Sequence, residues 1–146
     1  MKKNSDQTTD LYNEIYKNAA MGAGTVKHLL AGKRSEEMSE TLRKQYAEYL
    51  AVCRSASSAQ ASRGEKIKGL SGMAKMRTDV GVSLNTLFDR SDAHVAKLMM
   101  NGGVMGVINA EKKLNECPQA DEKAKDLMRH LSDYELSTID IMKSYL

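Results

Sequence analysis

Histidine and cysteine are the side chains of this sequence that most readily bind metals or act as nucleophiles. The histidines are His28, His94 and His130, and the cysteines, Cys53 and Cys117, lie far apart and form no Cys-x-x-Cys pair. This spacing signals neither a zinc site nor a disulfide framework. The sequence also specifies no Ser-His-Asp, Cys-His or paired-carboxylate arrangement. We therefore predict no catalytic residue, no metal ligand and no cofactor.

His130 is the histidine with the best placed carboxylate. Asp126 precedes it by four residues, which is about one helical turn, so the two side chains are expected to lie together on one helix face. One interpretation is an acid–base or metal arrangement. The simpler interpretation is a surface pair between successive turns, and this is the one that we expect.

Three tyrosines and one asparagine fall near the middle of segments that have helical periodicity. Buried tyrosine hydroxyls usually find hydrogen-bond partners, and such clusters mostly fix the packing of a core. We predict a polar cluster at the centre of the fold, with a structural role. Its four members are Tyr46, Tyr49, Asn101 and Tyr134.

Glycine gathers in two helix-like segments, 19–24 and 99–106. Each glycine inside a helix sacrifices ~1 kcal/mol relative to alanine, so some other interaction must compensate. Close packing of the two helices is the first interpretation, with methionine as core filler. A ligand cavity or a subunit interface is the alternative. The candidate positions are Gly22, Gly24, Gly102, Gly103, Met105 and Gly106.

Apolar residues recur at helical spacing in four long segments, which we predict as helices. The predicted helices span residues 9–31, 36–63, 92–116 and 119–145. Thr8 or Thr9 is the predicted N-cap of the first helix, and Ser35 and Ser91 cap the second and third. Pro118 prevents the third helix from continuing smoothly into the fourth.

The same spacing predicts which side chains face the core. For the first helix these are Leu11, Ile15, Ala19, Gly22, Val26 and Leu29. For the third they are Val95, Leu98, Met99, Gly102, Met105 and Ile108. For the fourth they are Ala124, Leu127, Leu131, Tyr134, Thr138, Ile141 and Tyr145. Each set marks one stripe of an amphipathic helix.

A long connection separates the first two helices from the last two. It covers residues 65–90 and contains several glycines, but residues 72–88 remain helix-like, so we predict an extra, shorter helix there. Two helical hairpins joined by one long connection form a four-helix bundle with a single crossover. The sequence therefore predicts one all-α domain over residues 1–146.

Composition supports this fold and sets limits on partners. One proline, one phenylalanine and no tryptophan in 146 residues favour helices over strands. The net charge of +3 is scattered among acidic residues, so we expect no nucleic-acid partner. The least polar stretch, 98–110, is shorter than a bilayer span, and no apolar leader follows the start, so we expect a cytoplasmic protein without a membrane span.

The layout of hairpin, long connection and hairpin resembles the ferritin-like superfamily, particularly its small bacterial members, and the resemblance covers the whole chain. Members of this superfamily bind two metals through one glutamate from each of two helices and a Glu-x-x-His motif from each of the others. In this sequence the residues three positions before the histidines are Thr25, Ser91 and Leu127. The motif is absent, so no metal ligand of the family carries over.

These observations favour a non-catalytic structural or interaction protein on a ferritin-like scaffold. The resemblance also implies a bacterial homodimer, and we expect it to bind a further protein. One alternative is an unconventional metal-binding or oxidoreductase-like bundle whose ligands come from different helices. A second alternative is a binder of a small apolar ligand, held between helices 9–31 and 92–116, because glycine and methionine concentrate there.

Overall fold

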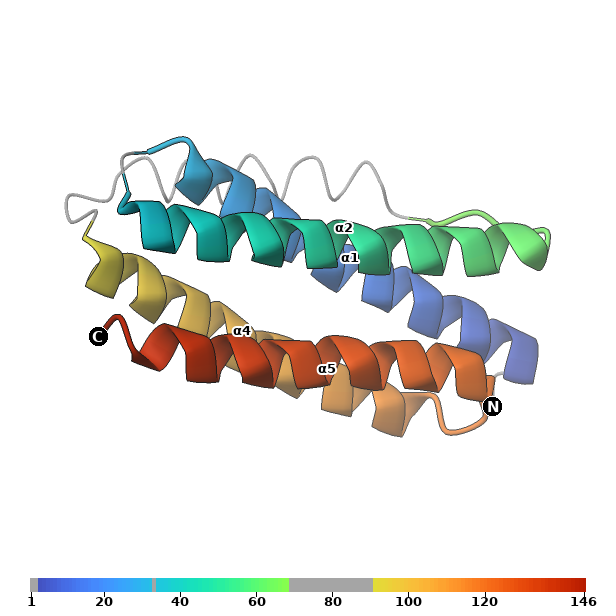
Figure 1. The fold of residues 1–146 in the computed structure, drawn as a ribbon. Coiled ribbons are helices and arrows are strands. Elements are labelled where there is room, and N and C mark those ends of the chain that lie inside the picture. The colour runs from blue at the N-terminus through green and yellow to red at the C-terminus, as the bar shows by residue number, and fades with distance from the viewer. Residues whose placement is uncertain (1–2, 33, 69–90) are drawn as a thin grey trace.

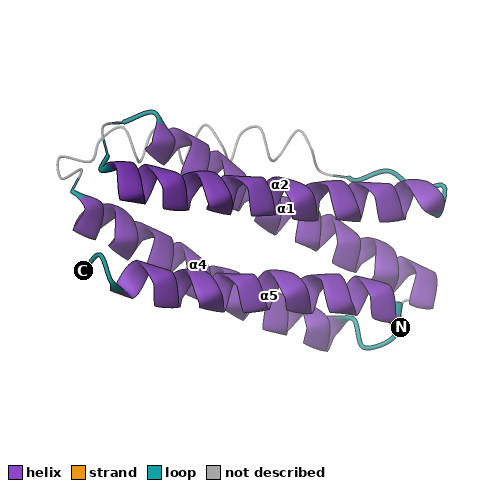
Figure 2. Ribbon diagram, viewed as in Figure 1, coloured by secondary structure: helices purple, strands orange, loops and turns teal. Residues whose placement is uncertain are grey.

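The computed structural model describes residues 3–32, 34–68 and 91–146, and these ranges form four long helices (Figures 1 and 2). They are α1 (Asn4–Leu30), α2 (Glu36–Ser62), α4 (Asp92–Glu116) and α5 (Glu122–Lys143). The described part of the chain contains no strand. The predicted all-α four-helix bundle is therefore confirmed, while the predicted helix at 72–88 lies outside the described residues.

The helices pack as two antiparallel hairpins. α1 packs mainly against α2, and α4 mainly against α5, with sparser contacts between the hairpins. α2 and α4 run in the same direction along the bundle, as Figure 1 shows. At the end where both begin, the Ser35 hydroxyl donates to a carboxylate oxygen of Asp92 at 2.5 Å, so the two helix starts lie side by side.

Two N-caps follow the sequence prediction, because each depends on one local hydrogen bond. The Ser35 hydroxyl accepts from the backbone N–H of Met38 at 3.1 Å. The Ser91 hydroxyl accepts from the backbone N–H of His94 at 3.2 Å. Each bond satisfies one backbone donor that the first helical turn leaves unpaired.

The predicted start of the first helix is wrong, because its threonines serve other partners. α1 begins at Asn4, so Thr8 and Thr9 lie inside it. The Thr8 hydroxyl accepts from the backbone N–H of Asp121 at 2.8 Å, and the Thr9 hydroxyl accepts from Arg63 at 3.0 Å. Contacts distant in sequence therefore occupy the hydroxyls that had been assigned to a cap.

The α4–α5 turn is held by α1, which explains the later start of the last helix. The backbone N–H of Gln119 donates to Gln7 Oε1 at 2.7 Å, next to the Thr8–Asp121 bond. These bonds hold residues 119–121 outside a helix, and α5 begins at Glu122 instead of 119. The last helix thus starts where its backbone donors are no longer bonded to α1.

The buried face of α1 agrees with the predicted periodicity. In α1 the predicted large apolar residues are all buried, and Gly22 is partly buried. In the second hairpin the prediction is wrong in part, because the buried face of α4 is rotated toward smaller residues. Met105 and Ile108 are 57% and 53% exposed, and Ile141 of α5 is 44% exposed. The buried residues of α4 are Val95, Ala96, Met99, Gly103 and Ala110.

Within the described residues, no helix is both long enough and apolar enough to cross a membrane.

Candidate functional site

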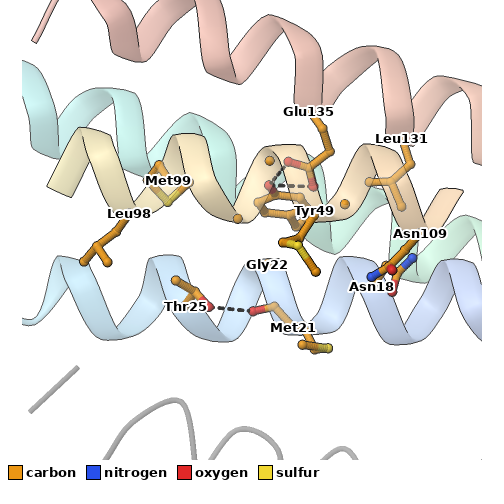
Figure 3. A pocket seen from close by; sticks show the side chains of 14 residues that line it. Asn18, Met21, Gly22, Thr25, Tyr49, Leu98, Met99, Asn109, Leu131 and Glu135 are labelled. Carbon is orange, nitrogen blue, oxygen red and sulfur yellow. Dashed lines mark hydrogen bonds between the residues drawn. The ribbon is translucent and has the colours of Figure 1, made fainter. Parts of the chain in front are cut away.

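A cavity of about 160 Å³ lies between α1 and α4, near the middle of the bundle (Figure 3). α2 and α5 close its inner side through Tyr49, Leu131 and Glu135. Most of its lining is apolar or glycine. The lining residues of α1 are Asn18, Met21, Gly22 and Thr25. Those of α4 are Leu98, Met99, Gly102, Gly103, Met105, Gly106 and Asn109.

A buried carboxyl is the principal polar group of this cavity. Glu135 is 6% exposed, and the hydroxyl of Tyr49, itself 3% exposed, donates to its two carboxylate oxygens, each at 2.9 Å. Figure 3 shows the Tyr49 hydroxyl directed at the carboxyl. This bond joins α2 of one hairpin to α5 of the other.

Burial controls the protonation of these groups. It raises the pKa of Glu135 to about 7, while the hydrogen bond from Tyr49 acts in the opposite direction. Burial also raises the pKa of Tyr49, and the charge of Glu135 raises it further. Burial, with the charges of Glu48 and Glu135, raises the pKa of Tyr134 to about 12. At neutral pH both tyrosines are therefore neutral, and Glu135 is about half protonated.

Two glycines make room for this pair. A Cβ placed on Gly22 would lie 2.7 Å from ring atoms of Tyr49, well inside van der Waals contact. A Cβ on Gly106 would lie 3.2 Å from the carboxyl of Glu135. Both glycines therefore act within their own hairpin. The tightest contacts at these two positions are to α2 and α5, and not between the first and third helices as first interpreted.

Two further glycines of α4 have different surroundings. A Cβ on Gly103 would meet Ile139 at 3.1 Å, so this position packs closely on α5. A Cβ on Gly102 would meet no atom within 4 Å. Gly102 thus faces open space at the cavity, and its missing side chain keeps that space open.

Of the six predicted close-packing or cavity residues, five line this cavity, and Gly24 does not. Gly24 lines a separate groove between α1 and α2, together with His28, Tyr46 and Cys53. Gly22 and Gly24 are two residues apart in a helix, so they cannot share one face. The predicted residues at the α1–α4 cavity are Gly22, Gly102, Gly103, Met105 and Gly106.

Half of the predicted polar cluster forms. The rings of Tyr49 and Tyr134 meet edge to face, with centroids 5.9 Å apart and planes at 86°. Asn101 is exposed, and Tyr46 is half-buried in the groove between α1 and α2, so neither belongs to the cluster. The buried polar groups instead include Glu135 and a second hydrogen bond, in which the Thr138 hydroxyl donates to Gln45 Oε1 at 2.7 Å.

The sequence suggested that His130 pairs with Asp126, but in the structure each has another partner. Its Nε2 lies 2.7 Å from Glu48 Oε1, across the α2–α5 interface, while Asp126 pairs with Arg129 at 3.0 Å. Another bond across this interface links Thr41 to the hydroxyl of Tyr145 at 3.0 Å. A polar seam of four contacts thus joins the hairpins, and the Tyr49–Glu135 bond is its buried contact at the cavity.

Glu135 and Asn18 are two of the cavity residues that the predicted polar cluster and glycine set did not include. Glu135 follows Tyr134 directly, and the predicted core stripe of that helix was drawn through the tyrosine. The Nδ2 atom of Asn18 is buried and has no hydrogen-bond partner among the described residues. A signal for Glu135 was present, because Leu131, Glu135 and Thr138 are spaced by four and three residues and therefore share one helix face.

In the described part of the chain, no three His, Cys, Asp or Glu side chains lie close enough together to hold a metal ion. Comparison with protein-family models, with curated proteins and with solved structures found no match for this chain. The residues of the cavity are therefore the observations on which a function can be argued.

Alanine at Gly22 and at Gly102 tests the different roles of these two helical glycines. Gly22→Ala should lower the free energy of unfolding by ~1–3 kcal/mol, because the Tyr49 ring is buried and bonded and has little room to move. Gly102→Ala is the matched control and should raise the free energy of unfolding by roughly 0.5–1 kcal/mol, since alanine favours helix and meets open space. Urea unfolding followed by circular dichroism measures both. Equal effects would contradict the assignment.

Proposed function

We propose that this chain is a non-catalytic binding protein that holds a small, mostly apolar molecule between α1 and α4. The observation that carries the proposal is the cavity whose apolar walls surround one buried carboxyl, that of Glu135. Apolar pockets with a few placed polar groups are the common form of small-molecule sites, and helical bundles build them between facing helices.

The size of the cavity limits the ligand. Its volume of about 160 Å³ is close to the roughly 150 Å³ of an engineered cavity that binds benzene. A ligand with one small ring or a short branched chain fits such a space. Methionine supports this use, because Met21, Met99 and Met105 line the cavity and methionine side chains adapt to irregular shapes.

The wall also contains polar groups that can orient a ligand. Glu135 offers acceptor positions beyond the one hydrogen supplied by Tyr49. The buried Nδ2 of Asn18 adds a donor that is unpaired among the described residues. A buried donor without a partner is unfavourable, and a ligand acceptor would relieve that cost.

The scaffold itself, in this proposal, is a ferritin-like bundle with a single crossover and without a di-metal site. The parallel course of α2 and α4 supports the crossover, because two successive parallel helices need a connection between opposite ends of the bundle. The sequence supports a scaffold without a di-metal site, since no histidine follows a glutamate at the Glu-x-x-His spacing. A bacterial cytoplasmic location is the setting that we propose for it.

Benzene is a suitable neutral probe of this cavity. In nitrogen-resolved NMR titrations we expect saturable shifts of the backbone amides of Gly102, Gly103 and Gly106, because all three line the cavity. Gly102→Leu should abolish the shifts by placing a side chain in the open space. Asn101→Leu, on an exposed neighbouring position, is the matched control and should leave them unchanged. Shifts that do not saturate, or that survive in Gly102→Leu, would refute the site.

A second candidate function is protein interaction, and one exposed patch favours it. Val104, Met105 and Ile108 of α4 are 47%, 57% and 53% exposed, and their spacing places them on one side of the helix. Exposed apolar patches of this kind often mark protein interfaces. We infer a homodimer as the partner expected from the family resemblance.

Sedimentation equilibrium at micromolar concentration tests this second function. We expect a dimer for the unmodified chain and a monomer for Val104→Lys/Ile108→Lys, because two ammonium groups would have to be buried in the interface. Ser55→Lys/Ser58→Lys, at exposed positions of α2, adds the same two ammonium groups on another helix; it is the control and should remain dimeric. A monomer for the unmodified chain would remove the homodimer.

A further inference from the structure

Among the described residues, no cation pairs with the buried carboxyl of Glu135. Its carboxyl is placed in the wall of the α1–α4 cavity by α5, and Gly106 leaves the space that the group occupies. Among the described residues, the hydroxyl of Tyr49 donates the hydrogen bond that its oxygens accept. A hydroxyl supplies one hydrogen and no charge, so the carboxylate keeps unused acceptor positions.

The surrounding elements supply no positive charge either. The described residues of α1, α2 and α4 that line the cavity include no lysine, arginine or histidine. On α5 itself, the neighbouring titratable group is Tyr134, which is neutral at physiological pH. Glu48, the carboxylate next to Tyr49 in the sequence of α2, is paired with His130 at the α2–α5 surface. The described lining of the cavity therefore has one acidic group among neutral residues.

An unpaired carboxylate in such a place is costly. Removing an ionised group from water without a partner costs several kcal/mol, and proteins usually respond by protonating it. The raised pKa of Glu135 is that response. A cation entering the cavity would instead stabilise the ionised form, because a nearby opposite charge favours an ionised carboxylate.

We propose that the α1–α4 cavity selects a small organic cation, an amine whose ammonium group binds the carboxylate of Glu135 while its apolar part lies against Met21, Met99 and Leu131. This inference rests on the proposed binding function and names its ligand class. Organic amines fit both features of the wall, whereas a neutral hydrocarbon would leave the carboxyl unused.

A metal ion is a poorer match for these residues. Metal ions take several protein ligands, and the described residues place no group of three acidic, histidine or cysteine side chains together. The methionines and the leucine around Glu135 solvate a hydrocarbon better than an ion. An ammonium needs only one carboxylate and a few acceptors, and it carries its own apolar part.

Benzylamine and benzyl alcohol form a matched pair of probes, since they have the same shape and differ in charge. In calorimetric titrations at pH 8, where Glu135 is mostly ionised, the unmodified chain should bind benzylamine at least ~10-fold more tightly than benzyl alcohol. Glu135→Gln should lose the preference and bind benzyl alcohol at least as tightly as benzylamine, because glutamine keeps the shape but leaves the ammonium without a counter-charge. Glu48→Gln removes a carboxylate outside the cavity and should keep the preference.

A measurement without any substitution guards against misfolding of the variant. In the unmodified chain the preference for benzylamine should shrink from pH 8 to pH 5, because the carboxyl gains a proton that the amine must displace. Equal binding of the two probes at pH 8, or a preference that survives in Glu135→Gln, would overturn the selection of a cation while leaving the cavity a binding site. Absence of binding by both probes would overturn the binding function itself.

Discussion

The hydrogen bond between Tyr49 and Glu135 is the interaction on which the centre of this bundle depends. It connects α2 to α5, and thus one hairpin to the other, in a region where both side chains are buried. A buried carboxyl and a buried hydroxyl each require a partner, so neither helix can shift along the other without leaving a polar group unpaired. The bond therefore fixes the register of the two hairpins.

The glycines of α1 and α4 follow from this constraint. Gly22 leaves room for the Tyr49 ring, and Gly106 leaves room for the Glu135 carboxyl. Glycine weakens a helix, which explains why such residues are acceptable only where packing compensates. Gly102 has no such contact and opens onto the cavity. The same short segment of α4 thus accommodates the polar pair and leaves the adjacent space between α1 and α4.

The sequence predicted features that depend on local spacing. Helix α2, its Ser35 cap and the buried face of α1 follow from capping chemistry and a period of 3.6 residues, which need no knowledge of neighbours. The start of α1 was not predictable in this way, because the Thr8 hydroxyl is bonded to Asp121, which is distant in sequence. Local preference and tertiary contact compete there, and the tertiary contact decides.

The candidate site was predictable in part for the same reason. Glycine content drew attention to the segments of α1 and α4 that line the cavity, although close packing was the first interpretation, and Tyr49 was identified as a central polar residue. Glu135 was missed because an isolated glutamate on a helix is usually exposed, and only the hydroxyl of Tyr49 on another helix makes its burial tolerable. Asn101 and Tyr46 were misplaced because the rotation of each helix about its axis depends on its neighbours.

The protonation state of Glu135 affects both its hydrogen bond with Tyr49 and the charge in the wall of the cavity. Its pKa in the folded chain, about 7, lies above the ordinary value of 4.5 for a glutamate. The stability that it contributes is therefore fully present below about pH 4.5 and is lost as the pH rises through about 7. A shift of this size corresponds to roughly 3 kcal/mol.

Direct titration of this carboxyl tests the account most closely. Carbon-13 NMR of glutamate side-chain carboxyls, with Glu135→Gln to assign the resonance, gives its midpoint in the ligand-free chain. We predict a midpoint near 7, as for a buried acid without a cation. A midpoint near 4.5, the value of a solvated glutamate, would show that the carboxyl is hydrated or paired with a cation, and would contradict the account.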